Sequence, residues 1–87
     1  MKKREPLLIF MEILATLQAG PRGPTRLAQG CNINYGRLEA YTRPLLGKGL
    51  IRSETVDGQE VLSLNEEGYR VYRDWLEIWR RLPLDMT

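Results

Sequence analysis

The stretch TRLAQGCNINYGRLEAYTRPLLGKGLIRSETVDGQEVLSL, residues 25–64, contains the pattern that decides the fold. Thr25 is a residue type that caps helices, and the apolar residues after it share one face of a short helix that ends near Cys31. Asn34 predicts the start of a longer helix that continues to about Lys48, where a glycine follows. Two helices joined by a turn of about three residues are typical of a helix-turn-helix.

A β-hairpin is predicted directly after these helices. Leu50–Thr55 and Glu60–Leu64 alternate in polarity, and they flank Val56–Gln59. The pair Asp57-Gly58 inside that segment favours a tight hairpin turn, because both residue types tolerate a positive φ. A helix-turn-helix followed at once by a two-stranded hairpin predicts a winged helix-turn-helix.

One further helix is expected on each side of this segment. A helix over about residues 6–19 has apolar positions at helical spacing, which are Leu7, Leu8, Met11, Ile13, Leu14 and Leu17. A last helix runs from Asn65, another capping residue, to about Leu82, where Pro83 stops it. We therefore expect an α+β, mainly helical, winged helix-turn-helix with three helices, a β-hairpin wing and a C-terminal helix.

The composition leaves few groups for catalysis. The 87 residues are enough for one core, and they include no histidine and a single cysteine. Neither a histidine-dependent nucleophile nor a disulfide or thiolate zinc cluster can form within the chain. The longest apolar run, Leu7–Met11, is far too short to span a bilayer. We expect a cytoplasmic protein that is not an enzyme, with no catalytic residues, metal, cofactor or small-molecule ligand and no membrane partner.

The charges are unevenly distributed along the chain. Residues 20–52 carry six basic side chains against one acidic side chain, a net charge of +5, whereas residues 53–87 carry four against eight, a net charge of −4. The six basic residues are Arg22, Arg26, Arg37, Arg43, Lys48 and Arg52. An anionic partner is therefore expected to bind the middle third of the chain.

The helix after Asn34 has an unusual outward face. A helical wheel places Tyr35 and Leu46 with the inward positions or at their edge, and it places arginines and small residues outward. Such a face allows close approach to a DNA groove, where arginine reaches phosphates or guanine. The candidate DNA-binding residues are Arg22, Thr25, Arg26, Asn34, Tyr35, Gly36, Arg37, Ala40, Arg43, Lys48 and Arg52.

The tip of the hairpin is acidic and opposes contact with phosphate. Glu54, Asp57 and Glu60 lie at or near the turn. Lys48 and Arg52, at the base of the hairpin, are better placed to contact DNA.

The last helix is too apolar for a single contact. One stripe contains Tyr69, Tyr72, Leu76 and Trp79, and another contains Val71, Trp75, Ile78 and Leu82. One stripe can pack on the domain, and a second copy of the chain is the simplest cover for the other. The candidate dimerisation residues are Tyr72, Trp75, Leu76, Ile78, Trp79 and Leu82. In the alternative, both stripes form one broad face buried against the first helix.

Several segments resemble the archaeal winged-helix DNA-binding proteins of the ten-a chromatin type. They are Thr25-Arg26-Leu27-Ala28, Asn32-Ile33-Asn34-Tyr35, Gly49-Leu50-Ile51 and Glu67-Gly68, and the resemblance extends over residues 7 to about 82. It implies a small DNA-binding or regulatory protein that dimerises through antiparallel pairing of its last helix.

Taken together, the residues predict binding to double-stranded DNA, sequence-specific or non-specific, by a small transcriptional regulator or chromatin protein that acts as a homodimer. Residues 1–64 are expected to form the winged helix-turn-helix DNA-binding domain, and residues 65–87 the dimerisation helix with a short tail. The protein would then be nucleoid-associated. The alternative is a winged-helix protein-protein interaction module that does not bind DNA.

Overall fold

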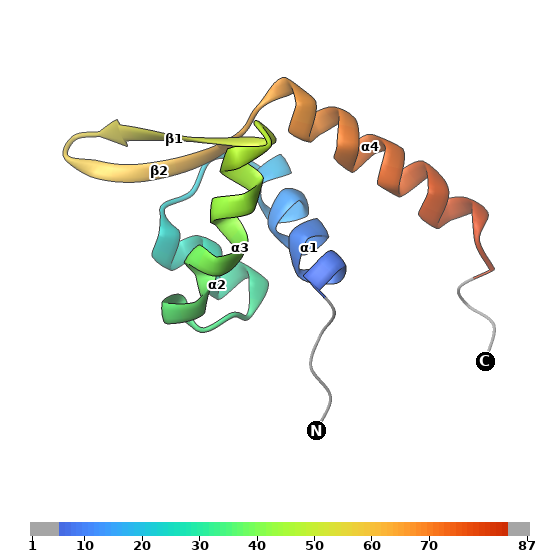
Figure 1. The fold of residues 1–87 in the computed structure, drawn as a ribbon, viewed down its shortest axis with the longest axis horizontal. Coiled ribbons are helices and arrows are strands. Elements are labelled where there is room, and N and C mark those ends of the chain that lie inside the picture. Colours follow the sequence, from blue (N-terminus) through green and yellow to red (C-terminus); the bar gives the residue numbers. More distant parts are fainter. Residues whose placement is uncertain (1–5, 84–87) are drawn as a thin grey trace.

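The structure is a computed structural model that describes residues 6–83. The elements follow the predicted order, as α1 (Pro6–Gln18), α2 (Pro24–Cys31), α3 (Tyr35–Gly47), β1 (Ile51–Val56), β2 (Gln59–Leu64) and α4 (Glu66–Arg81). Figure 1 shows α1, α2 and α3 gathered below the base of the hairpin, while the hairpin and α4 extend to opposite sides. The predicted mainly helical fold with a two-stranded wing is confirmed.

The core lies where the first three helices meet the base of the hairpin. Its most deeply buried large side chains are Ile13, Leu14, Leu17, Leu27 and Ile51. Leu62 and Leu64 of β2 complete it, whereas every residue of β1 after Ile51 is exposed. The outer part of the wing is therefore held by its own strand pairing rather than by the core.

The turn between α2 and α3 is closed by two asparagines. Asn32 adopts a left-handed conformation with φ 56°, and Asn34 caps α3 by accepting a 2.7 Å hydrogen bond from the amide of Gly36. The cap predicted at Asn34 is confirmed. The cap predicted at Thr25 is wrong, because α2 begins at Pro24 and Gly23, two residues before Thr25, holds the N-cap position.

The hairpin has a two-residue turn. Strand pairing runs from Ile51 opposite Leu64 to Val56 opposite Gln59. Asp57 and Gly58 have φ values of 54° and 78°, as a type I′ turn requires. The predicted turn is confirmed, and the strands begin and end within a residue of their predicted limits.

The loop before α2 extends the sheet by one bridge. The amide of Arg22 donates to the carbonyl of Leu62 at 3.0 Å, and the amide of Leu62 donates back at 2.8 Å. These two bonds fix the start of α2 against β2. Within residues 6–83, no helix is long and apolar enough to cross a membrane.

Candidate nucleic-acid interface

Helix α3 buries one narrow stripe and exposes the rest of its surface. Leu38, Thr42 and Leu45 are buried. The residues predicted to face outward are all exposed, namely Gly36, Arg37, Glu39, Ala40, Arg43, Pro44 and Gly47. The helix continues through Pro44 without interruption. The outward face predicted by the helical wheel is confirmed.

Two residues that the wheel placed inward or at the edge are exposed instead. Tyr35 is 62% exposed and Leu46 is 37% exposed. Both line a groove of about 360 Å³ between α3 and β2, together with Glu39, Arg43 and Glu60. Strand β2 does not cover this part of α3, so the apolar parts of the Tyr35 and Leu46 side chains face the open groove.

The two arginines of the α3 face are held by neighbours one helical turn away. Arg43 Nη2 lies 2.7 Å from the Glu39 carboxylate, and both side chains are exposed. Arg37 Nη2 lies 3.4 Å from the hydroxyl of Tyr41. Exposed ion pairs at this spacing contribute only about 0.3–0.5 kcal/mol, so Arg43 can exchange Glu39 for another anion at little cost.

Sequence reasoning omitted Glu39 from the site. Its carboxylate lies on the same exposed face as the arginines and lines the same groove as Glu60. The signal was present in the sequence, since Glu39 and Arg43 are four residues apart on one helix.

Two of the candidates at the start of α2 share a second groove with α3. Thr25 and Arg26 are exposed in the first turn of α2, and they line this groove with Tyr35 and Gln59. Arg22 is held apart from them, because its Nε donates to the carbonyl of Thr16 at 3.4 Å. The structure thus brings together the candidates of the α2 start and the α3 start, without Arg22.

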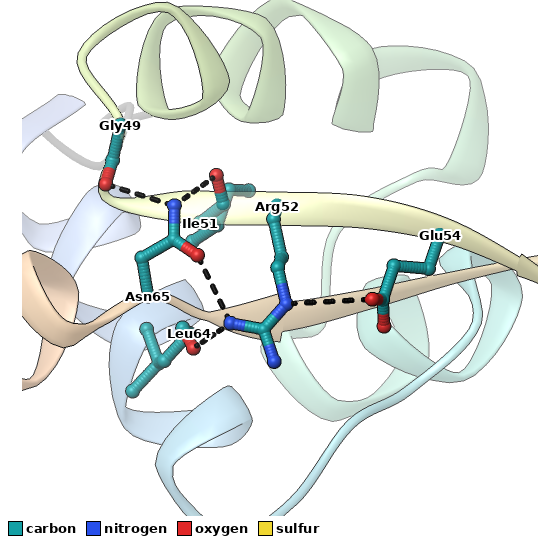
Figure 2. A network of polar contacts seen from close by, with 6 residues as sticks. All are labelled: Gly49, Ile51, Arg52, Glu54, Leu64 and Asn65. Carbon is teal, nitrogen blue, oxygen red and sulfur yellow. Dashed lines mark hydrogen bonds and ion pairs between the residues drawn. The ribbon is translucent and has the colours of Figure 1, made fainter.

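Arg52 is occupied within the chain at the base of the wing. Figure 2 shows its Nη1 donating to the carbonyl of Leu64 at 3.1 Å and to Oδ1 of Asn65 at 3.0 Å. Its Nε lies 3.8 Å from the Glu54 carboxylate. Lys48, by contrast, is exposed at the end of α3.

Asn65 stands at the N-cap position of α4 but does not cap it with its side chain. Its Nδ2 donates to the carbonyls of Gly49 at 3.0 Å and of Ile51 at 3.3 Å. The side-chain cap that the sequence predicted is therefore wrong, because the tertiary fold offers this amide two backbone acceptors.

A second exposed surface runs along α4 and the start of α1. In the first half of α4, Gly68 is buried, and Val71, Tyr72 and Trp75 pack partly against the core. In the second half, Ile78 is 55%, Trp79 45% and Leu82 49% exposed. The two predicted stripes are thus parts of one broad face, which the body of the domain partly covers at Val71, Tyr72 and Trp75 and leaves exposed at Tyr69 and in the second half.

Helix α1 contributes to the same surface. Leu7 and Leu8, two of the apolar residues at helical spacing, are exposed, while Ile9 is buried. A groove of about 330 Å³ separates α1 from α4, and its walls include Leu8, Met11, Tyr72, Trp75, Leu76 and Trp79. The rings of Trp75 and Trp79 lie 5.3 Å apart.

These features define a winged helix-turn-helix protein in which α3, the second helix of the helix-turn-helix, has an exposed face. Residues 3–81 match the model of the family described as winged helix-turn-helix, and the chain belongs to that family. No curated protein matches the chain.

Several solved structures have the same fold. The transcriptional regulator BldR from Sulfolobus solfataricus has a TM-score of 0.76 and 21% identity, over 84% of this chain and 55% of BldR. Sso10a-2, a DNA-binding protein from the same organism, has a TM-score of 0.76 and 23% identity, over 88% of this chain and 80% of that one. The homodimeric winged helix-turn-helix DNA-binding domain of a possible ArsR-family transcriptional regulator from Mycobacterium bovis has a TM-score of 0.75 and 18% identity, over 83% of this chain and 68% of that one.

Proposed function

We propose that this protein binds double-stranded DNA through the exposed face of α3 and acts as a small transcriptional regulator. The observation that carries the proposal is the composition of that face. Gly36 and Ala40 leave the helix backbone accessible, and Arg37 and Arg43 flank them. A helix with this profile can enter the major groove, because its small residues permit close approach and its arginines reach phosphates and guanine edges.

The charge distribution supports the same assignment. Arg26 and Thr25 are exposed beside the start of α3 and extend the basic surface toward α2. In helix-turn-helix proteins the first helix of the pair crosses the phosphate backbone while the second enters the groove. Arg26 is therefore assigned to phosphate contact and Tyr35 to the groove edge.

Acidic side chains near the same surface favour a regulator over a general packaging protein. Glu39 and Glu60 line the groove between α3 and β2, and the wing tip carries Glu54 and Asp57. Non-specific binding depends on neutralised phosphates and is weakened by nearby carboxylates. Contacts to base edges are weakened less, because glutamate accepts a hydrogen bond from cytosine.

Solved structures of the same fold support the proposal. BldR is a transcriptional regulator and Sso10a-2 is a DNA-binding protein. The proposed function is binding, and no residue is assigned a catalytic part. Binding to DNA would place the protein on the chromosome.

We further propose that the protein is a homodimer formed through α4. The second half of its apolar face is exposed and continues onto Leu8 of α1. Antiparallel pairing of the exposed second halves would bury Ile78, Trp79 and Leu82 of each copy against the other copy. A homodimer is also known for the Mycobacterium bovis domain of the same fold.

The proposed function is tested by electrophoretic mobility shift with random duplex DNA at several salt concentrations. DNA binding predicts retardation that weakens as salt rises, with a slope set by the number of phosphates contacted. The absence of any retardation at low salt would contradict the proposal and would leave the protein-protein interaction module as the remaining candidate.

A further inference from the structure

The first turn of α4 is pressed against the corner that joins α3 to β1, residues 48–51. Gly68 is the residue of closest approach and is buried. A Cβ at this position would overlap the carbonyl oxygen of Leu50 and would lie 2.9 Å from Cδ2 of Leu64. Because the main obstacle is backbone, a side chain here requires α4 to move away from the corner.

Asn65 joins α4 to the same corner by hydrogen bonds. Its backbone amide donates to the Leu50 carbonyl at 3.0 Å, and its side-chain amide donates to Gly49 and Ile51. Three consecutive carbonyls of the corner are thus bound by one residue. Figure 2 shows the side chain of Asn65 pointing toward Gly49, which follows α3, and toward Ile51, the first residue of β1.

Arg52, in strand β1 of the wing, also binds Asn65. Its Nη1 binds both the Leu64 carbonyl and Oδ1 of Asn65, so the guanidinium bridges β1, the end of β2 and the residue before α4. The corner itself is bonded to α3, since the amide of Leu50 donates to Leu45 at 3.0 Å. A continuous set of contacts therefore links α3 to the beginning of α4.

The orientation of α4 depends on this contact and on the packing of Val71, Tyr72 and Trp75 against the core. Figure 1 shows α4 extending away from the hairpin, and the second half of the helix leaves Ile78, Trp79 and Leu82 exposed. A helix of 16 residues is roughly 24 Å long, so a rotation of about 10° at its first turn displaces its far end by about 4 Å. The half of α4 that carries the proposed dimer surface lies at that far end.

We propose that Asn65 and Gly68 are positioning residues that fix α4 relative to α3 and thereby set the separation of the two recognition helices in the dimer. The inference rests on the proposed homodimer and its binding to DNA. Dimeric helix-turn-helix proteins read two half-sites whose separation follows from protein geometry. Asn65 and Gly68 therefore determine the half-site spacing without touching DNA.

The first measurement is the distance between α2 and the far half of α4 within one protomer. Spin labels are attached at Gln29→Cys and Glu77→Cys in a Cys31→Ala background, and the labelled chain is diluted with unlabelled protein. We expect a narrow distance distribution for the parent chain. Asn65→Ala and Gly68→Ala should shift or broaden it. Glu66→Ala is the matched control, because Glu66 directly follows Asn65 and its side chain is exposed.

The second measurement is selection of bound sequences from random duplex DNA. The parent chain and Glu66→Ala should select pairs of half-sites at one spacing, and Asn65→Ala should lose that preference while each half-site keeps its sequence. A merely stabilising role for Asn65 would lower affinity and leave the spacing unchanged.

The results separate this inference from the proposed function. If the parent chain selects no DNA, the proposed function fails, and the label distances still decide whether α4 is fixed at the corner. Unchanged distances in folded Asn65→Ala protein overturn the inference, as does a changed distance with an unchanged spacing. If Gly68→Ala does not fold, Asn65→Ala and Arg52→Ala, both without a backbone clash, carry the test.

Discussion

Arg37 and Arg43 lie on one face of α3 but are held by different partners. Arg37 contacts the hydroxyl of Tyr41, whose ring packs edge-on against Phe10 at 5.9 Å. Arg43 contacts Glu39, which is as exposed as the arginine itself. The position of Arg37 is thus linked to the core, whereas Arg43 is free to follow a ligand.

Replacing both arginines by alanine should weaken binding to duplex DNA and flatten its salt dependence. The slope of log affinity against log salt should fall by about 0.9 for each phosphate that the variant no longer binds. Mobility shift at several salt concentrations measures both effects. Arg70→Ala with Arg73→Ala removes the same charge from the exposed side of α4 and serves as the control. Equal losses of affinity in the two double variants would mean that α3 is not the binding helix.

Replacing Glu39 by glutamine should strengthen non-specific binding. The change removes a negative charge from the α3 face and releases Arg43. A charge pair 4 Å apart in water is worth about 1 kcal/mol, so the gain should reach roughly fivefold. Filter binding with random duplex DNA measures it, and Glu66→Gln, on α4, is the control. Weaker binding of Glu39→Gln would show that the carboxylate itself contributes to recognition.

The three capping residues show what a sequence can determine at the scale of one residue. Asn34 caps α3 as predicted because the acceptor and the amide of Gly36 are two residues apart and need no other element. Thr25 and Asn65 are equally good capping types, yet neither caps. Helix α2 begins at Pro24, so that its N-cap is Gly23, two residues before Thr25, and the side chain of Asn65 binds the distant carbonyls of Gly49 and Ile51 instead. Long-range partners of this kind are not visible in local sequence.

At the scale of elements, helix and strand limits were largely predictable. They depend on the spacing of apolar residues along the chain and on the glycine, proline and asparagine residues that begin or end helices and turns. The hairpin needed only alternation and the Asp57-Gly58 turn. Exposure was less predictable. Leu7, Leu8 and Leu46 have apolar side chains at helical spacing, but whether such a face is covered depends on how far the neighbouring element extends.

The wing should become a DNA-binding element when its negative charge is removed. Residues 51–64 carry Arg52 against Glu54, Asp57 and Glu60. Glu54→Lys combined with Asp57→Asn reverses the sign of this charge. Asparagine is chosen at position 57 because φ is 54° there, and asparagine tolerates that conformation.

We expect this double variant to fold normally and to bind random duplex DNA more tightly at low salt, because the wing would now attract phosphate. Asp74→Asn with Glu77→Lys makes the same change of charge on exposed positions of α4 and is the control. Equal gains in the two variants would indicate a general effect of net charge, and a loss of binding would indicate that the acidic wing itself has a part in recognition.

At the scale of the whole molecule, the apolar face of α4 is longer than the body that it covers. Trp75 packs partly on the core, while Trp79, one turn later, stays 45% exposed beside Ile78 and Leu82. The sequence showed that α4 has too much apolar surface for one contact. It did not show which half of the apolar face stays exposed, because that depends on how far α1 and the core extend along α4.

The last prediction concerns dimerisation through the second half of α4. Ile78→Glu or Trp79→Glu should turn the dimer into a folded monomer, because each change places a charge in the interface twice across the twofold axis. Truncating a central interface residue costs about 2 kcal/mol or more, so two copies should weaken association by roughly three orders of magnitude. Sedimentation equilibrium over a range of concentrations measures the dissociation constant. Val56→Glu, an exposed apolar residue at the distant wing tip, is the matched control and should leave the dimer intact. The parent chain must sediment as a dimer for the prediction to hold, and a parent that stays monomeric up to high micromolar concentration contradicts it. Since both variants retain α3, they should still bind a single half-site, but more weakly than the dimer binds two.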